Sequence, residues 1–504
     1  MYLQGLQGIS VSIEADVSDG LPGYAFVGYL ASEVKESQDR VRTAIRNLGL
    51  SLPPKKVTIN LSPADIRKEG TGFDLPIAVA ILMAHGCIIP DPMEDTVFIG
   101  ELGLDGKVKG IPGILVLTDW AREQGYRRIF LPKENVNEAS VIDGIGLIGV
   151  ETLEEVVAIL QGSKEAQEYV RDEKPDLIAG LNQYHVDFSE VNGQAVLRRA
   201  AEVAAAGGHN LLMIGPAGSG KTMVARRMPT ILPKLTLQEC ITISKTYSVK
   251  GLLNSEQPLV VNRPFRAPHH SISPQALTGG GNRPKPGEIS LASGGILFLD
   301  ELPELSVTAI ENLREPLEER KITISRVQDT VVYPANIQLI SAMNPCKCGH
   351  YPNPELCTCT PSQVKRYLSR VSRPILDRID IAVEAAAVTY DEMTGKGHNE
   401  TSESIRKRVE AAREIQIKRF QGLSIRCNSE MTGKQIRDFC PINNEESQFL
   451  KMVFEEMELS ARIYDKILKI ARTTADLDGR DKIAHKDLCE AISYVRVRNK
   501  YWRH

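Results

Sequence analysis

The sequence predicts an α/β protein whose central part is a doubly wound parallel sheet. Three apolar runs carry this prediction. The run at 210–214 leads into a glycine-rich loop and a helical segment, the run at 295–299 ends in two acidic residues, and the run at 337–343 ends in an asparagine. Short apolar runs separated by helical segments indicate parallel strands joined by crossover helices, and such units build doubly wound sheets.

The loop after the first run has the pattern G-x-x-x-x-G-K-[ST] at residues 215–222. Its glycines let the backbone curl so that N–H groups point at a polyphosphate, while Lys221 reaches the β and γ phosphates and Thr222 binds Mg²⁺. The alternative is a glycine-rich turn without a ligand, but the strand before the loop and the helix after it oppose that interpretation. We therefore predict a site for ATP and Mg²⁺. Its loop residues are Gly215, Pro216, Ala217, Gly218, Ser219, Gly220, Lys221 and Thr222.

The second run ends in Asp300 and Glu301, the arrangement of a Walker B motif. Asp300 is expected to hold the water shell of Mg²⁺, and Glu301 to polarise a water for attack on the γ phosphate. Asn344, at the end of the third run, is a candidate for orienting that water from the opposite side. A protein that only binds a nucleotide has no need of the second acid, so the pattern predicts ATP hydrolysis. The alternative is a buried strand capped by two solvated acids.

Two arginines are candidates for stabilising charge on the γ phosphate. Arg378, in RPILDRID at 373–380, follows a helical segment and is expected to point away from its own nucleotide and complete a neighbour's site, as arginine fingers do. The alternative is a surface arginine paired with Asp377 or Asp380. Arg462 opens a helical segment and is expected to close over the phosphates; its alternative is an ordinary solvated arginine at a helix start.

The chain has 504 residues, too many for one core, and at roughly 100 to 200 residues per domain it is expected to hold about three domains. Alternating short strands and helical segments predict an α/β domain at 1–165. A charged stretch with few large apolar residues predicts a linker at 166–183. The nucleotide-binding core is expected at 184–395, and almost purely helical periodicity predicts a small helical lid at 396–504.

Composition and charge exclude several classes of protein. The hydrophobic content of 42% and charged content of 25% are typical of a soluble globular chain, and no apolar run approaches the ~18 residues that cross a bilayer. The first residues lack a basic leader and carry Glu14 and Asp16, so we expect a cytoplasmic protein with no membrane partner. The net charge of −3 places any DNA contact in local patches.

Four of the nine cysteines form two C-x-C pairs separated by a turn-rich loop. Four thiolates in a short loop suit tetrahedral Zn²⁺, and such an ion would be structural because the protein supplies all four ligands. The pairs are closer than the usual C-x₂₋₄-C spacing, so unliganded thiols of a reducing compartment are the alternative. The candidate zinc ligands are Cys346, Cys348, Cys357 and Cys359.

Basic residues gather in segments that are candidates for contact with a nucleic-acid backbone. RPFRAPHH at 263–270 precedes a glycine-rich basic loop, and RKITISRVQ at 320–328 reads as a hairpin before Asn344. Binding there is expected to be independent of base sequence and sensitive to salt. The alternative is exposed loops or contacts between subunits. The candidate residues are Arg263, Arg266, His269, His270, Lys285, Lys321 and Arg326.

Several motifs together resemble those of the ComM/YifB family of magnesium-chelatase-like AAA+ ATPases. They are GLPGYAFVG at 20–28, NLSPADIRKEGTGFDLPIA at 60–78, GPAGSGKT at 215–222, RPFRAPHH at 263–270, PGEISLASGGILFLDE at 286–301, AMNPCKCG at 342–349 and RPILDRID at 373–380. The resemblance implies a homo-oligomeric ring, a hexamer, with ATP bound between subunits. It also implies action on single-stranded or branched DNA: unwinding and branch migration during recombination of incoming DNA. Arg373 stands where the family pattern has a glycine.

The resemblance leaves two rival functions open. The first is an ATPase subunit of a metal chelatase that inserts Mg²⁺ into a porphyrin. The second is a protein-remodelling ATPase, suggested by an amino-terminal segment that resembles the Lon protease domain, as in GELGLDGKVKGIPGIL at 100–115. A Lon-type site needs a serine and an activating lysine. Gly72 and Leu115 stand in those places, and Thr71 beside them has no lysine partner, so the domain is expected to be catalytically inactive and to serve as a scaffold or DNA guide.

Overall fold

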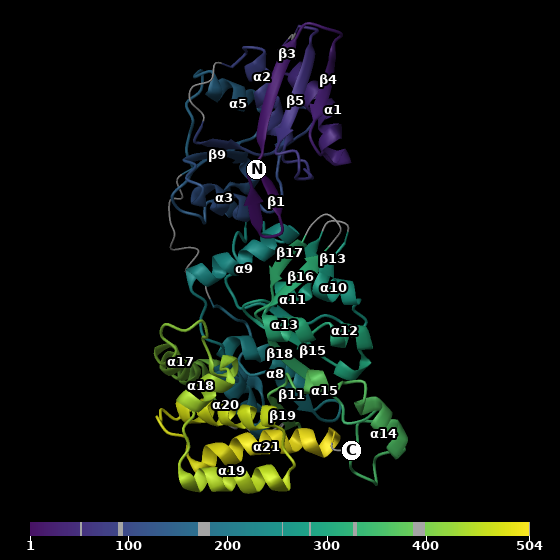
Figure 1. Ribbon diagram of the computed structural model, residues 1–504, viewed down its shortest axis with the longest axis vertical. Helices are drawn as coiled ribbons and strands as arrows, with labels where there is room; N and C mark the ends of the chain where they lie inside the picture. Colours follow the sequence, from purple (N-terminus) through teal and green to yellow (C-terminus); the bar gives the residue numbers. More distant parts are fainter. Residues whose placement is uncertain are drawn as a thin grey trace. The chain divides into compact units, whose positions relative to one another are not determined.

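The computed structural model describes residues 1–50, 53–88, 94–169, 182–254, 256–281, 284–325, 330–386 and 399–502 (Figure 1). The chain divides into two compact units, each assembled from segments that are far apart in the sequence. The first unit comprises Met1–Ala179, Leu237–Val260 and Ser325–Tyr333. The second comprises Gly180–Thr236, Val261–Ile324 and Pro334–His504.

The first unit contains two three-stranded sheets. Their strands are β3 Ser12–Ser18, β4 Gly23–Val27, β5 Lys56–Ser62, β6 Thr96–Phe98, β9 Arg128–Pro132 and β10 Gly146–Val150. In one sheet β5 lies between β3, which is antiparallel to it, and β4, which is parallel. In the other, β9 lies between β6 and β10, and both pairings are parallel. The shorter strands are β1 Tyr2–Gln4, β2 Gln7–Ile9, β7 Glu101–Leu102 and β8 Val108–Lys109.

Apolar periodicity explains how this unit buries its core. In β5 the buried residues are Val57, Ile59 and Leu61, the alternation of a strand with one covered face. The helix from Asp74 to Ala84 is apolar nearly all round, as expected for a helix enclosed by its neighbours. The helices of the unit are α1 Ser32–Asn47, α2 Asp74–Ala84, α3 Ile114–Glu123, α4 Val136–Ala139, α5 Leu153–Leu160 and α9 Leu237–Lys250.

The second unit is built on a five-stranded parallel sheet. Its strands are β11 Leu211–Ile214, β12 Phe265–Arg266, β15 Ile296–Leu299, β18 Gln338–Met343 and β19 Ile381–Glu384. The order is β12-β15-β18-β11-β19, so the strand that precedes the glycine-rich loop lies near the centre. β11 and β15 are buried at every residue, which accounts for their continuous apolar runs. The prediction of a parallel sheet in an α/β protein is therefore confirmed.

Helices surround this sheet. The helices before residue 399 are α7 Ala195–Gly207, α8 Lys221–Arg227, α10 Pro274–Thr278, α11 Glu288–Leu291, α12 Val307–Glu311, α13 Arg314–Glu319, α14 Pro361–Leu368 and α15 Arg373–Leu376. Short ribbons pair β13 Gly279–Gly280 with β14 Lys285–Pro286, and β16 Lys321–Ser325 with β17 Thr330–Pro334. The second ribbon is the hairpin that the sequence predicts before Asn344.

The described residues after 398 contain helices and no strand. These helices are α17 Ser402–Arg419, α18 Gly433–Phe439, α19 Asn444–Glu456, α20 Ala461–Leu477 and α21 His485–Trp502. Side-chain caps begin two of them: Thr401 accepts from the backbone N–H of Ser404, and Asn443 from that of Glu446. The helical periodicity read from the sequence therefore corresponds to helices.

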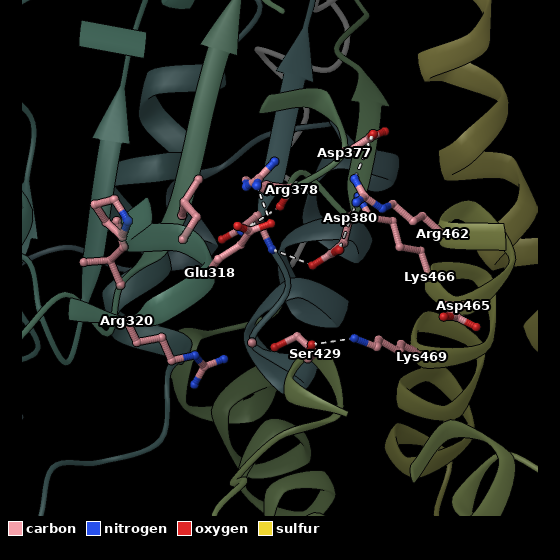
Figure 2. Close-up of a pocket in the computed structure, with 15 residues that line it drawn as sticks. Glu318, Arg320, Asp377, Arg378, Asp380, Ser429, Arg462, Asp465, Lys466 and Lys469 are labelled. Atoms are coloured by element: carbon pink, nitrogen blue, oxygen red, sulfur yellow. Dashed lines mark hydrogen bonds and ion pairs between the residues drawn. The ribbon is translucent and has the colours of Figure 1, made fainter. Parts of the chain in front are cut away.

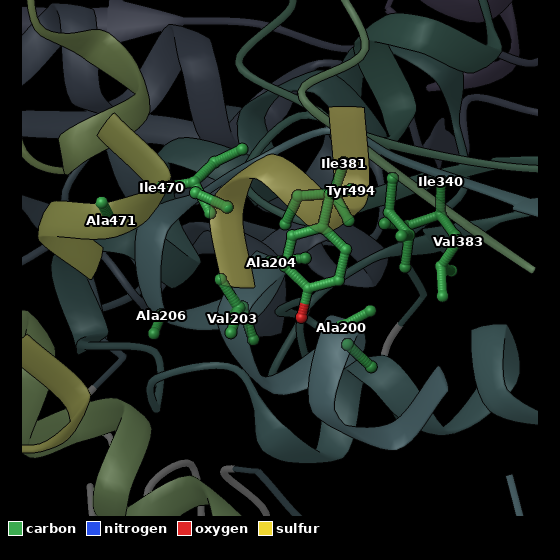
Figure 3. Packing of buried hydrophobic residues seen from close by; sticks show 14 of the residues in the cluster. Ala200, Val203, Ala204, Ala206, Ile340, Ile381, Val383, Ile470, Ala471 and Tyr494 are labelled. Carbon is green, nitrogen blue, oxygen red and sulfur yellow. The ribbon is translucent and has the colours of Figure 1, made fainter. Parts of the chain in front are cut away.

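These helices share a core with the sheet. Ala200, Val203 and Ala204 of α7 pack in one buried cluster with Ile340 of the sheet and Tyr494 of α21 (Figure 3). Small alanine side chains let the helices approach closely, and the hydroxyl of Tyr494 donates to a carboxylate oxygen of Glu490 at 2.9 Å. The described residues contain no helix whose length and apolarity would let it cross a membrane.

Candidate functional site

The glycine-rich loop lies at the carboxyl edge of the five-stranded sheet, between β11 and α8. The backbone N–H of Gly215 donates to the carbonyl of Met343 at 3.1 Å, which places Asn344 beside the start of the loop. From the other side, the Thr222 hydroxyl donates to a carboxylate oxygen of Asp300 at 2.8 Å. The three apolar runs of the sequence therefore end at one place.

Backbone geometry explains the glycines of the loop. A Cβ on Gly215 would lie 2.4 Å from the carbonyl oxygen of Ala385, closer than any side chain tolerates. Gly218 and Gly220 have φ values of +77° and +81°, in the left-handed region that glycine occupies without strain. These conformations turn the loop around the lysine that follows it.

Lys221 points into the loop. Its ammonium group donates to the carbonyl oxygens of Gly215 at 2.8 Å and Pro216 at 2.7 Å, and to the Ser219 hydroxyl at 3.2 Å. Burial lowers the pKa of Lys221, and the charge of Asp300 opposes that shift. A polyphosphate would replace these neutral acceptors with charged ones, which form stronger hydrogen bonds with an ammonium group.

The oxygen ligands at this edge suit a Mg²⁺–nucleotide complex. Mg²⁺ prefers oxygen ligands, keeps several waters, and is commonly bound through one or two protein groups plus substrate phosphates. The Thr222 hydroxyl and the Asp300 carboxylate supply such groups within hydrogen-bond distance of each other, and Lys221 faces the phosphate position. The residues predicted from the loop and from the Walker B strand are thus brought together.

Glu301 is held in an unusual backbone conformation next to a histidine. Its φ of 49° is left-handed, which is uncommon for a residue with a side chain. Nδ1 of His270 lies 2.9 Å from a carboxylate oxygen of Glu301, and the ring of His270 lies 4.0 Å from that of His269. His270, predicted as a DNA contact, is therefore engaged with the candidate catalytic acid in this structure.

The candidate arginines lie at the opposite edge of the same sheet, in a pocket of about 270 Å³ (Figure 2). Asn210, Ile337 and Asp380, which line it, each precede a strand of the sheet directly. In a parallel sheet the starts of the strands share one edge, away from the edge that holds the loop. The charged side chains that line the pocket are Glu318, Arg320, Asp377, Arg378, Asp380, Arg462, Asp465, Lys466 and Lys469.

Arg378 is largely buried in this pocket, with 11% of its side chain exposed. It forms an ion pair with Glu318 and donates to the carbonyl of Pro374 at 2.5 Å. Its Nε is buried without a hydrogen-bond partner among the described residues. Asp377 and Asp380 were the alternative partners expected from the sequence, whereas the structure pairs Arg378 with Glu318, a residue that carried no motif.

Arg462 lines the same pocket as Arg378. It is the second residue of α20, its side chain is 71% exposed, and it lies 3.6 Å from a carboxylate oxygen of Asp377. Arg462, expected to close over the phosphates, lies away from the phosphate loop of its own chain, because the strand β11 separates the two edges. Both arginines instead face away from their own phosphate loop.

A buried ionic group supports the pocket, and sequence patterns did not reveal it. Lys466 lies 3.6 Å from a carboxylate oxygen of Asp380 and donates to the carbonyl of Ile379 at 2.6 Å. Burial lowers the pKa of Lys466 to about 8. Burial alone would raise the pKa of Asp380, but Lys466 and His209 outweigh it and hold that pKa below its usual range.

The four predicted zinc ligands converge. The sulfur atoms of Cys346, Cys348, Cys357 and Cys359 all lie within 4.8 Å of one another. Three of the separations are 3.3, 3.8 and 3.6 Å, close to the ~3.8 Å between sulfurs of a tetrahedron with bonds of about 2.3 Å. Hydrogen bonds, first from the backbone of His350 and then from Cys346 and other neighbours, lower the pKa of the Cys348 thiol to about 5, which favours the thiolate that binds metal.

Two of the predicted DNA contacts are engaged in the fold. Arg263 donates to the carbonyl oxygens of Pro233 at 2.6 Å and Gly294 at 2.9 Å. Arg266 forms a bidentate pair with Glu288, with distances of 2.6 and 2.8 Å. Both guanidinium groups therefore hold the segment in place.

The other residues predicted to contact DNA differ in how exposed their side chains are. The side chains of Lys285 and Lys321 are exposed, Lys321 by 53%. His269 donates or accepts within its own turn, where Nδ1 lies 2.8 Å from the Ser271 hydroxyl. Arg326 lies outside the described residues. The two lysines are thus the candidates that the described structure leaves most accessible.

The amino-terminal segment that resembles the Lon protease domain is expected to be catalytically inactive. Among the described residues, no amine contacts the hydroxyl of Thr71 in this segment. Thr71 donates to the carboxylate of Glu101, and Leu115 is fully buried within α3. The ammonium group of Lys68 donates to the carbonyl of Pro63. Thr71 thus has an acid as its partner, where a Lon-type site would need the amine of a lysine as the base.

Three family models match the chain. They are described as magnesium chelatase, subunit ChlI, at residues 187–393; subunit ChlI of Mg-chelatase at 13–135; and magnesium chelatase, subunit ChlI C-terminal, at 399–495. A shorter similarity joins the chain to Lon protease 2 of Bacillus subtilis, with 32% identity over 128 residues, 25% of this chain and 22% of that protein.

Two relatives are similar over almost the whole length. The competence protein ComM of Haemophilus influenzae is 41% identical over 495 residues, which is 97% of this chain and 95% of ComM. The uncharacterised protein YifB of Escherichia coli is 41% identical over 500 residues, 98% of this chain and 95% of YifB. With the nucleotide loop and Walker B strand at one sheet edge, these similarities show that the chain belongs to the ComM/YifB family of magnesium-chelatase-like AAA+ ATPases.

Proposed function

We propose that this protein is an ATP-driven ring motor that acts in the cytoplasm on single-stranded or branched DNA, unwinding it or moving branch points. The observation that carries the proposal is the division of the ATPase machinery between two edges of one sheet. Lys221, Asp300 and Glu301 lie at the carboxyl edge, whereas Arg378 and Arg462 line a pocket at the amino edge. One chain therefore supplies two halves that complete a site only against another copy, as in a closed ring.

Each group has a role in the proposed hydrolysis. The loop N–H groups and Lys221 bind the β and γ phosphates, and Thr222 and Asp300 orient Mg²⁺, which neutralises the phosphate charge when bound. Glu301 accepts a proton from the attacking water while Asn344 orients it. The neighbour's Arg378, with Arg462, stabilises the charge that develops on the γ phosphate.

Two observations support DNA as the substrate. The Haemophilus relative is named a competence protein. The ribbons β13–β14 and β16–β17 carry the exposed lysines Lys285 and Lys321, which offer charge to a phosphate backbone. Aromatic side chains are few in these segments, so binding should depend little on base sequence.

The test is ATP turnover with and without single-stranded and forked DNA. Turnover of the unaltered chain is expected to rise with DNA, and K285A combined with K321A is expected to remove the increase and to lower the salt dependence of DNA binding by about one unit of slope per lysine. K407A is the matched control, because Lys407 is an exposed lysine that pairs with Glu403 on α17. It should keep the full increase.

The rival functions predict other results. If DNA leaves turnover unchanged while unfolded protein raises it, the chain is a protein remodeller. If turnover responds only to a porphyrin-binding partner, it is a chelatase subunit, as the names of the matching family models suggest. In both cases ATP hydrolysis stands and the DNA proposal fails.

We further propose that the cysteine cluster binds one structural Zn²⁺ per chain. Metal analysis of purified protein is expected to show zinc, and C357S should lose it and unfold at a lower temperature, because a four-thiolate site stabilises the loop that it closes. C489S is the control, since Cys489 is an exposed cysteine elsewhere. Protein that contains no zinc at any stoichiometry would contradict the proposal.

A further inference from the structure

The amino-edge pocket holds an arginine that is already paired within its own chain. The side chains of Arg378 and Glu318 meet across the pocket, joined by an ion pair (Figure 2). Arg378 exposes 11% of its side chain, whereas Glu318 exposes 56%. An arginine that is needed by a neighbour's nucleotide is thus occupied by a carboxylate that water can reach.

We propose that Glu318 is a positioning residue that holds Arg378 against its own chain until a phosphate group of a neighbouring copy displaces the carboxylate. This inference rests on the proposed function, because it assumes that Arg378 acts on a neighbour's ATP. It adds a regulation of that site. Arg378 is restrained in the isolated chain and is released when the chain assembles with a neighbouring copy that has ATP bound.

The contacts of Arg378 suit an exchange of partners. Its Nη1 donates to the carbonyl of Pro374, which fixes one side of the guanidinium group, and its other terminal nitrogen meets Glu318. Nε is buried and has no partner within the described part of the chain. A phosphate offers several charged oxygens to the planar fork of an arginine, so it can satisfy more of these donors than one carboxylate oxygen does.

The carboxylate can leave at little cost. Water replaces the lost contact on the exposed side of Glu318, and the incoming phosphate takes over the buried charge of Arg378. Two other cations of the pocket have acids of their own: Lys466 lies against Asp380, and Arg462 against Asp377. Glu318 is therefore the acid whose departure frees Arg378 without unpairing another cation.

Glu318, the residue that would give up Arg378, lies close in sequence to the hairpin of β16 and β17. Glu318 lies near the end of α13, and Arg320 follows it with a left-handed φ of 55° directly before β16. The carbonyl of Arg320 accepts from the N–H of Ala335 at 2.8 Å, and its guanidinium pairs with Glu430. Glu318 thus lies three residues before the first residue of β16.

The test measures ATP turnover as a function of chain concentration. E318Q is expected to lower the concentration that gives half-maximal turnover, by between about two- and fivefold, the range that a weak ion pair contributes to an equilibrium. The KM for ATP should stay unchanged, since the phosphate loop lies at the other edge of the sheet. E318D, which keeps the charge, should behave like the unaltered chain.

E315Q is the matched control, because Glu315 is exposed on the same helix and should leave the curve in place. The proposed restraint is wrong if E318Q raises the chain concentration for half-maximal turnover, or if it changes that concentration no more than E315Q does. If R378A still abolishes turnover in that case, the proposal of a site shared between chains survives. If turnover depends neither on chain concentration nor on Arg378, the shared site itself fails. The two proposals are thereby tested separately.

Discussion

Replacement of Lys221 by alanine is expected to lower ATP turnover by at least about 10²-fold, the loss typical when one charged or hydrogen-bonding group is removed from a developing anion. The ammonium group is buried in the curl of the loop and points at the position that the phosphates would occupy. No neighbouring cation at this edge is aimed into the loop in the described structure. Turnover of purified K221A, measured by phosphate release, checks this result.

The control for this substitution lies on the same helix. Arg226 is an exposed cation one turn further along α8, and R226A should keep most of the turnover. Thermal unfolding of both variants shows whether the fold is retained. If K221A turns over ATP at the rate of R226A, the loop is not the catalytic nucleotide site.

Replacement of Arg378 by alanine is expected to lower turnover by ~10³-fold or more, the range of arginine fingers. The reason is the electrostatic stabilisation of the γ phosphate in the transition state, which only the neighbouring copy can supply if the two edges of the sheet meet between chains. R373A is the matched control: Arg373 precedes it in the same segment and its side chain is exposed. It should retain turnover.

Mixing two inactive variants tests the division of the site directly. K221A keeps Arg378, and R378A keeps its phosphate loop, so a mixed ring contains interfaces at which both groups are intact. Partial recovery of turnover on mixing is expected. If the mixture stays as inactive as its components while each variant still assembles, Arg378 serves its own chain or none.

The sequence predicted the carboxyl edge well because its requirements are local. The glycine-rich loop, the acidic pair after an apolar strand and the asparagine after the next strand each need only a few consecutive residues. The structure brings Gly215, Asp300 and Asn344 to one edge, as parallel strands must. The four cysteines were found for the same reason, because all four lie within one short loop of the sequence.

The amino-edge pocket could be predicted only in part. Arg378 and Arg462 stood out by their positions at the ends of helical segments, but nothing near Glu318 indicated that it would meet Arg378. The bond from Lys466 to the carbonyl of Ile379 joins residues 87 positions apart, and no local pattern encodes such a pair. Likewise, the contact between His270 and Glu301 depends on how two strands lie side by side.

By itself, the sequence determined that this protein has a parallel sheet followed by helices, with the glycine-rich loop and the acidic pair at the carboxyl edge of that sheet. Short-range backbone and hydrophobic requirements set these features, so they can be read along the chain. The tertiary structure decided that Arg378 pairs with Glu318, and that two distant stretches join the first unit. Those outcomes depend on the three-dimensional packing of segments far apart in sequence, where ion pairs form wherever the fold brings charges within reach.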